Sequence, residues 1–295
     1  MSTSLLLQAL MAGITNGFVY ALIGMGLAVI FKGSHVINAA QGDCAVIGAI
    51  AAVLLLSQAS IPYPLAAFGG AIVGALLSAA IDVLFVRRMK QRGAGEETYL
   101  LLTIGVALTL SASVLFFLGR GSYSLPPIGG DRVFLLLDAV LVEHAIWLVA
   151  GGVALTMGLQ LFYRRTTLGL SMMAASIDAE GAATTGIDVR RMRTLTFALG
   201  GLLAAFAGIL VAPLVAMDYH VGMSLTLKGF AAAILGGLTN PLGAVVGGLT
   251  IALLEAFAIS FISSSYKDVI AFSLLIAIMI ALPHGMLGRS GRVGG

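Results

Sequence analysis

The sequence predicts an all-α fold, a polytopic membrane helix bundle that forms a single transmembrane domain over residues 1–295. Hydrophobic residues make up 59% of the chain, charged residues only 10%, and the mean hydropathy is +1.06. Soluble domains carry about 25% charged residues, so this composition indicates an integral membrane protein. The 38 glycines agree, because glycine lets transmembrane helices approach closely. Spacings suited to that use are Gly13-x-x-x-Gly17, Gly70-x-x-x-Gly74 and Gly243-x-x-x-Gly247.

The apolar segments predict about eight transmembrane helices, because a bilayer core requires roughly 20 apolar residues per crossing. In chain order they are 6–31, 40–57, 62–86, 98–118, 144–163, 194–216, 243–262 and 268–288. A further run, 227–240, is too short to span alone. We expect it to be a half-helix or re-entrant piece buried in protein, because lipid cannot satisfy exposed backbone groups. The first run lacks the basic flank and cleavage site of a signal peptide, so we expect a retained helix.

Basic residues predict the orientation, since positive charge in short loops resists translocation. The loop at 87–92, with Arg87, Arg88, Lys90 and Arg92, and the arginine-flanked loop 163–193 are expected to be cytoplasmic, which puts the N-terminus outside. The C-terminus falls inside if 227–240 counts as part of a crossing and outside if it is re-entrant. With the first choice, the basic residues left outside are Arg120, Arg132, Lys228 and Lys267.

Two polar loops are candidate docking sites for partner proteins. Within 163–193 the stretch 171–186 is small and helix-tolerant, too polar for lipid and too apolar for a solvated linker. We expect a short helix presented to the cytoplasm, a form that fits a partner's groove. The segment 119–143 is the longest external loop and is either a plain connector or a docking rim for an external partner.

Two glycine-rich breaks interrupt the expected helices, one over 31–43 with Asn38 and one over 235–243 with Asn240. Paired breaks in opposite halves of a chain are typical of a translocation pathway, because unwound backbone offers polar groups at membrane depth. The alternative is two ordinary loops with asparagine at turns.

Several single residues also carry expectations. Ionisable groups inside membrane segments are functional candidates, which singles out Glu255 and Asp43. Glu255 is expected to have a polar partner inside the bundle, with a structural or a pathway role. Asp82 is expected to pair with Arg87 or Arg88. The single cysteine, Cys44, excludes an intrachain disulfide and a multi-cysteine metal site, and a small buried residue is expected. The four histidines show no metal-site spacing.

The chain resembles, over nearly its whole length, the permease subunits of branched-chain amino acid ABC importers. An N-terminal signature approximating G-L-x-L-I-F-x-x-x-x-V-I-N-F-A-H/Q-G is matched from Gly26 through Asn38 to Gln41 and Gly42. The cytoplasmic E-A-A-x-x-x-G loop of ABC permeases is matched by Glu180, Ala182 and Gly186. Further matches run from Leu195 to Ala204, from Leu235 to Gly248 and from Pro283 to Gly288.

Three departures from the family pattern bear on function. Gly181 stands at the second E-A-A position, and Met173 stands where the family often has arginine; both bear on coupling. Ala39 replaces the phenylalanine of the first signature, which bears on the width of the pathway.

The resemblance implies a transport subunit, itself no enzyme, that is moved by a separate ATPase and fed by a soluble periplasmic or extracellular binding protein. It further implies two ATP-binding subunits that hold the ATP and Mg, and a multi-pass location in the cell (inner) membrane. It also implies a second permease subunit, for which the resemblance favours a different chain over another copy of this one. No G-x-x-x-x-G-K-[ST] phosphate loop occurs in the sequence, which agrees with that division of labour. No cofactor, metal or nucleic acid is expected on this chain.

The two breaks, the intramembrane carboxylates and the resemblance together give the residue candidates. The substrate-pathway candidates are Asn38, Gln41, Gly42, Asp43, Thr239, Asn240 and Glu255. The ATPase-coupling candidates are Ala174, Ala175, Asp178, Glu180, Gly181, Ala182, Ala183 and Gly186.

Rival interpretations remain at the sequence level. The same signatures occur in permeases for urea, short amides and other amino acids. An ion-coupled secondary transporter would also use broken helices and a buried carboxylate, although it needs no cytoplasmic docking helix. A membrane enzyme lacks support, because no paired carboxylates or nucleophile motif lies on an expected helix.

Overall fold

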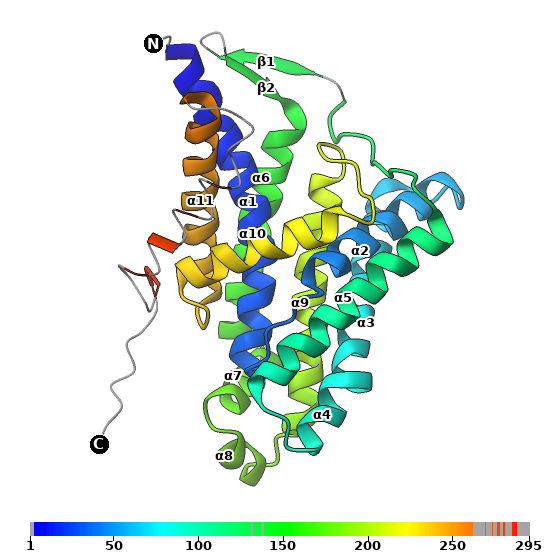
Figure 1. Ribbon diagram of the computed structural model, residues 1–295, viewed down its shortest axis with the longest axis vertical. Helices are drawn as coiled ribbons and strands as arrows, with labels where there is room; N and C mark the ends of the chain where they lie inside the picture. The colour runs from blue at the N-terminus through cyan, green and yellow to red at the C-terminus, as the bar shows by residue number, and fades with distance from the viewer. Residues whose placement is uncertain are drawn as a thin grey trace.

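The computed structural model describes residues 3–130, 132–136 and 139–261, together with positions 269, 273, 276, 277, 280 and 285–287. Its helices, in order, are α1 (Thr3–Ser34), α2 (Gln41–Ser57), α3 (Tyr63–Ile81), the π-helix η1 (Asp82–Val86), α4 (Arg87–Gln91), α5 (Glu96–Leu118), α6 (Glu143–Arg165), α7 (Thr167–Ile177), α8 (Ala179–Thr184), α9 (Val189–Val211), α10 (Val221–Gly236) and α11 (Pro241–Phe261). The predicted helix bundle is confirmed (Figure 1).

Within the described residues, six helical spans are long and apolar enough to cross a membrane, judged by length and composition. They are Leu5–Ser34, Tyr63–Gln91, Glu97–Leu118, Glu143–Arg165, Val189–Val211 and Pro241–Ser260. They correspond to six of the predicted crossings. The predicted crossing at 40–57 is the 17-residue α2, shorter than a spanning helix. The predicted crossing at 268–288 lies outside the described residues apart from the isolated positions.

The predicted short helix exists as α10, which begins at Val221, earlier than the sequence indicated, and ends at Gly236. Figure 1 shows α10 running obliquely across the bundle, next to α11 and α1 at one end and α2 at the other. Its 16 residues correspond to a length of about 24 Å, since an α-helix rises 1.5 Å per residue.

The segment 119–143, predicted to be the longest external loop, contains a feature that the all-α prediction omitted. Strands β1 (Val133–Leu136) and β2 (Ala139–Val142) form an antiparallel ribbon in which Val133 pairs with Val142. Both strands are short apolar runs without alternation (VFLL and AVLV), so the sequence carries no period-2 signal for them. A backbone bridge between Tyr123 and Met217 ties the same segment to the connection after α9.

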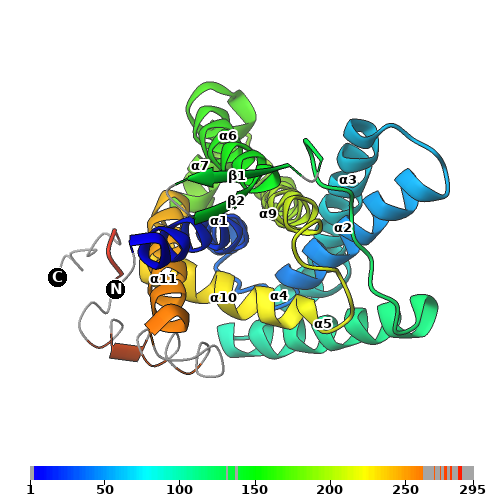
Figure 2. The same ribbon diagram turned by 90° about the horizontal axis from the view of Figure 1, so that it is seen from above.

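Close glycine contacts hold the bundle together around the buried helix α1. Gly13 and Gly17 of α1 pack on Leu253 and Leu249 of α11. The other two predicted spacings also mark close contacts, Gly74 on Gly201 of α9 and Gly243 on Gly236 of α10. Figure 2 shows α1 and α9 on the inside, with α6, α3, α2, α10 and α11 arranged around them.

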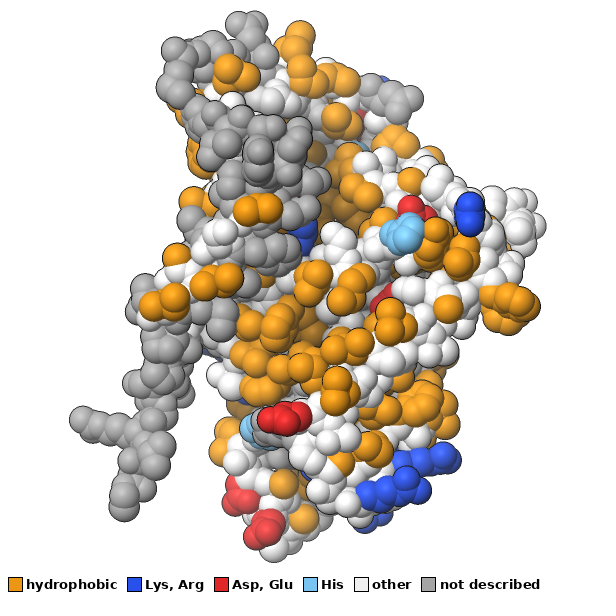
Figure 3. Space-filling model, viewed as in Figure 1, with side chains coloured by type: hydrophobic (Ala, Val, Ile, Leu, Met, Phe, Trp, Pro, Cys, Tyr) orange, Lys and Arg blue, Asp and Glu red, His pale blue; other side chains and the backbone are white. Residues whose placement is uncertain are grey.

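The two arginine-rich segments lie at the same end of the molecule. Figure 1 places α4, α7 and α8 together, opposite the N-terminus and the β1–β2 ribbon. In Figure 3 the basic side chains gather at that end, below a face dominated by apolar side chains. This arrangement agrees with the prediction that 87–92 and 163–193 share one side of the membrane.

Candidate functional site

The first predicted break connects α1 to α2, and its polar side chains are buried and hydrogen-bonded. Asn38 accepts a hydrogen bond from the Ala40 amide at 3.2 Å and donates one to Gln41 Oε1 at 3.3 Å. Gln41 Nε2 donates to the Gly200 carbonyl of α9 at 2.8 Å. The side chains of Asn38 and Gln41 are both fully buried. The Asn38 side chain therefore satisfies a backbone amide of the unwound segment, and the Gln41 side chain ties the start of α2 to α9.

Two further helices support this break. Thr226 Oγ1 of α10 accepts from the Gly42 amide at 2.9 Å and donates toward the Ala39 carbonyl at 3.1 Å. Ser111 Oγ of α5 donates to Asp43 Oδ1 at 2.8 Å. Gly42 lies against the Gly222 carbonyl, a contact that leaves no room for a side chain. The candidates Asn38, Gln41, Gly42 and Asp43 thus form one cluster against the first turns of α10.

The second predicted break lies elsewhere. Asn240 accepts from the Leu242 amide at 3.2 Å and so starts α11, while Thr239 is exposed. Asn240 also lines a cavity with Lys32, Tyr163 and Met173. The first break touches the start of α10 and the second follows its end, about 24 Å away by helix rise. The structure therefore does not bring the two predicted breaks together.

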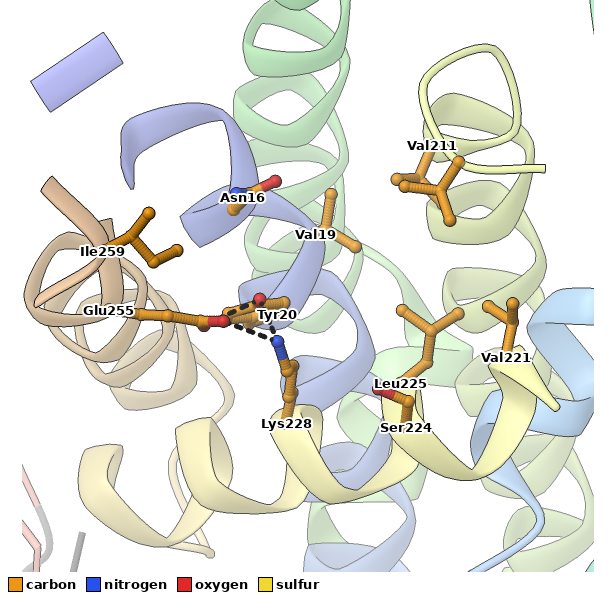
Figure 4. Close-up of a pocket in the computed structure, with 11 residues that line it drawn as sticks. Asn16, Val19, Tyr20, Val211, Val221, Ser224, Leu225, Lys228, Glu255 and Ile259 are labelled. Atoms are coloured by element: carbon orange, nitrogen blue, oxygen red, sulfur yellow. Dashed lines mark hydrogen bonds and ion pairs between the residues drawn. The ribbon is translucent and has the colours of Figure 1, made fainter. Parts of the chain in front are cut away.

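Glu255 has the polar partners that the sequence predicted. Lys228 Nζ donates to Glu255 Oε1 at 2.7 Å, and Tyr20 Oη donates to Glu255 Oε2 at 2.9 Å. Lys228 Nζ also donates to Tyr20 Oη at 2.8 Å, so the three groups close a triangle between α1, α10 and α11 (Figure 4). The side chains of Lys228 and Glu255 are 15% and 6% exposed.

The sequence predicted Lys228 as one of the basic residues left outside, at the start of the short run 227–240. The structure starts α10 at Val221, six residues earlier, and this places Lys228 in mid-helix. Two signals in the sequence could have identified Lys228 as a functional candidate. A lysine inside an apolar helix is itself a functional candidate, and a second such group, Glu255, lies on the next helix. Nothing in the sequence singles out Tyr20.

A cavity of about 290 Å³ opens beside this triangle. Its polar lining comprises Asn16, Tyr20, Ser224, Lys228 and Glu255, and its apolar lining comprises Val19, Val211, Val215, Val221, Leu225 and Ile259. Figure 4 shows that the lining comes from α1, α9, α10 and α11. One end of the cavity is charged, and the remaining lining is aliphatic apart from Asn16 and Ser224.

The prediction for Asp82 is corrected by the structure. Its buried carboxylate pairs with Arg193 Nε of α9 at 2.9 Å and accepts from Thr194 Oγ1 at 2.6 Å. Arg87 reaches the same cluster by donating to Thr194 Oγ1 at 2.9 Å. The π-helical turn that begins at Asp82 follows α3, which packs along α9, and this packing makes the distant arginine the nearer partner.

The predicted coupling helix over 171–186 is divided into two helices. Asp178 ends α7 and caps α8, accepting from the Gly181 amide at 2.9 Å. An aspartate with extended backbone is a strong helix N-cap, so α7 stops there and a new helix starts. Gly186, with φ of +86°, follows the end of α8 in a conformation that glycine adopts without strain.

The coupling candidates differ in exposure. Those on the exposed side are Ala174, Asp178, Glu180, Ala183 and Gly186; Ala175 and Gly181 are half-buried, and Ala182 is buried. A side chain at position 181 would meet Asp178 Oδ2, so Gly181 leaves room for the capping carboxylate. This contact gives a physical reason for the departure at the second E-A-A position. Ile177, which the sequence reading did not single out, is 78% exposed at the end of α7.

The apolar spans, the polar break between α1 and α2, and the short helices displayed at one end together define a polytopic membrane permease. Comparison with known proteins gives the family. The chain belongs to the branched-chain amino acid transport system / permease component family, whose model matches residues 9–279.

Individual relatives agree in name and length. The chain is 30% identical over 298 residues to the high-affinity branched-chain amino acid transport system permease protein LivH of Salmonella typhimurium, covering 96% of both chains. It is 32% identical over 300 residues to BraD of Pseudomonas aeruginosa, a protein of the same description, again covering 96% of both. A probable branched-chain amino acid permease LivH of Methanocaldococcus jannaschii is 31% identical over 90% of this chain and 88% of its own.

Proposed function

We propose that this chain is the membrane permease subunit of a binding-protein-dependent ABC importer for branched-chain amino acids. The observation that carries the proposal is the family match over residues 9–279, together with relatives of that description aligned over 96% of both chains. The subunit lies in the cell (inner) membrane and catalyses no reaction itself. ATP and Mg bind to partner subunits, which supply the energy.

The proposed assembly contains two ATP-binding subunits, a second permease subunit of a different chain and a soluble substrate-binding protein outside the membrane. The docking surface for an ATP-binding subunit consists of α7 and α8. In support, Ile177 and Glu180 are exposed there, next to the small side chains of Ala174 and Ala183, so a partner's groove can approach closely. The basic residues at this end of the bundle support a cytoplasmic position.

The proposed pathway is lined by the Asn38–Asp43 break and Glu255, with Thr239 and Asn240 at the end near α7. The amides of Asn38 and Gln41 are occupied by internal hydrogen bonds, so a transport cycle that uses them must move α10 or α9 relative to the break. Because Thr226 of α10 bonds Gly42 and Ala39 directly, a shift of α10 would release the break.

The test is reconstitution. We expect the chain to co-purify with an ATP-binding subunit and a second permease, and vesicles holding the complex to accumulate leucine only with ATP and the binding protein. Vesicles with this chain alone should accumulate nothing. Accumulation by the chain alone under an ion gradient would instead establish a secondary transporter. ATP-driven uptake of urea or a short amide without leucine uptake would overturn the assigned substrate.

A further inference from the structure

The cavity beside Lys228 and Glu255 combines a buried charge pair with an aliphatic wall. Its charged end holds one cation and one anion in direct contact, with Nζ 2.7 Å from Oε1. Ser224 and Asn16, two polar residues of the lining, are exposed, so the cavity is accessible from outside the core.

We infer that this cavity is a transient binding site for a zwitterionic amino acid with an aliphatic side chain, in which Lys228 receives the α-carboxylate and Glu255 the α-ammonium. The inference rests on the proposed function and adds to it a site, two recognition residues and a reason for the substrate class. Tyr20 completes the site, because its hydroxyl already accepts from Lys228 and donates to Glu255.

Charge balance selects the ligand. The ion pair is neutral overall, and a zwitterion inserted between its two members leaves the site neutral, with each charge facing its opposite. A cationic or anionic solute would leave one buried charge without compensation, which is costly at membrane depth. The site therefore favours zwitterions over charged solutes and offers neutral amides weaker hydrogen bonds.

Size and wall chemistry narrow the class further. A volume of about 290 Å³ lies at the lower limit of ordinary small-molecule pockets, roughly 300 Å³. Val19, Val211, Val221, Leu225 and Ile259 present branched aliphatic surface to whatever occupies the space, and burying such surface favours an aliphatic side chain.

Weak binding suits this role. A ligand must break the direct Lys228–Glu255 contact before it can make its own, so part of its binding energy is cancelled. A passage site that binds only loosely also lets the solute leave. The position of Lys228 on α10, two residues after Thr226, puts the cavity on the same helix that braces the Asn38–Asp43 break.

The first test uses two double variants in the reconstituted complex. Lys228→Met with Glu255→Gln removes both charges without stranding either one in the interior. We expect the complex to assemble and leucine uptake to fall at least about tenfold, as the loss of charge-assisted contacts to substrate predicts. Lys228→Glu with Glu255→Lys restores an ion pair in reverse and should recover part of the uptake. Normal uptake by the neutral variant would show that the pair is only structural and overturn the inference.

The second test probes occupancy directly. Ser224→Cys places a thiol in the cavity lining, and Ser122→Cys places one on the external segment; the native Cys44 is buried. In the assembled complex, leucine and the binding protein should slow labelling of Ser224→Cys by a small thiol reagent and leave Ser122→Cys unchanged. Equal labelling with and without leucine would overturn the inference. Leucine uptake by the wild-type complex tests the proposed function separately. A failure of the proposed function can therefore be distinguished from a failure of the inferred binding site.

Discussion

Arg193 of α9 donates a hydrogen bond from Nε to Asp82 Oδ1 at 2.9 Å, joining the first turns of α9 to the π-helical turn that follows α3. The carboxylate is fully buried and the arginine side chain is 11% exposed. The pair anchors the start of α9, which follows α7 and α8, to the end of α3 at the arginine-rich end of the bundle.

Asp82→Asn should destabilise the protein strongly. It leaves Arg193 buried without its anion, and breaking a buried pair in this way costs about 3–5 kcal/mol. The matched control is Asp188→Asn, which removes a pair with Arg191 whose side chains are 82% and 48% exposed; exposed pairs contribute about 1 kcal/mol or less. Thermal unfolding of the purified protein measures both, and equal effects would contradict the assigned role of Asp82.

Glu180→Lys should uncouple ATP hydrolysis from uptake while leaving the protein in the membrane. A reversed charge at an exposed contact position disfavours docking of the ATP-binding subunit, and a tenfold loss of affinity corresponds to about 1.4 kcal/mol. Glu97→Lys is the control, because it makes the same charge change on an exposed residue at the start of α5. Uptake per ATP hydrolysed measures the effect. Wild-type coupling in the Glu180 variant would remove α8 from the docking surface.

Gly181→Ala, which introduces the residue usual in the family, should weaken α8. The new methyl group meets Asp178 Oδ2, so the carboxylate must rotate and its capping bond to the amide of residue 181 should weaken, by no more than the roughly 1 kcal/mol that a lost N-cap costs. Faster hydrogen exchange at the amides of α8 reports this loss. Gly158→Ala in α6 is the control, since nothing lies near the added methyl group. Unchanged exchange in α8 would contradict the explanation given for this glycine.

Gly42→Ala should disrupt the junction of α2 and α10. The added methyl group meets the Gly222 carbonyl and Thr226 Oγ1, and overpacking of this kind costs about 1–3 kcal/mol. Because the obstacle is backbone, the cost should fall at the upper end of that range and uptake should fall as well. Gly105→Ala in α5 adds a methyl group where nothing lies nearby; it should keep wild-type uptake and should not lower stability, because alanine favours a helix interior over glycine.

The sequence predicted what depends on local pattern. Apolar length located the helices, glycine spacing located close contacts, and a buried carboxylate indicated that Glu255 needed a partner. The sequence did not predict which side chains form hydrogen bonds or ion pairs where the pairing depends on how the helices pack. Tyr20 donates a hydrogen bond to Glu255, although the two residues are 235 positions apart in the sequence. Asp82 pairs with Arg193 and not with the arginines that directly follow it, because α3 packs along α9.

Helix boundaries were the other source of error. Hydropathy alone marks a run at 227–240 and puts Lys228 at its edge, whereas α10 starts at Val221 and holds Lys228 in mid-helix. The division at Asp178 was missed because the alanine-rich composition of 171–186 suits a continuous helix, while a single capping side chain was enough to end it. The functional roles of the pathway and coupling residues stay predictions.

The tight turn from α10 to α11 has a mechanical consequence. Gly236 and Gly243 bring the backbones of α10 and α11 into direct contact. The Lys228–Glu255 ion pair joins the same two helices farther from the turn. With no side chain between them to deform, the two helices must turn as one rigid body. A displacement of α7 that moves the Asn240 end would therefore rotate α10 as well. The N-terminal end of α10 would then move, and the hydrogen bond from the Gly42 amide to Thr226 would weaken.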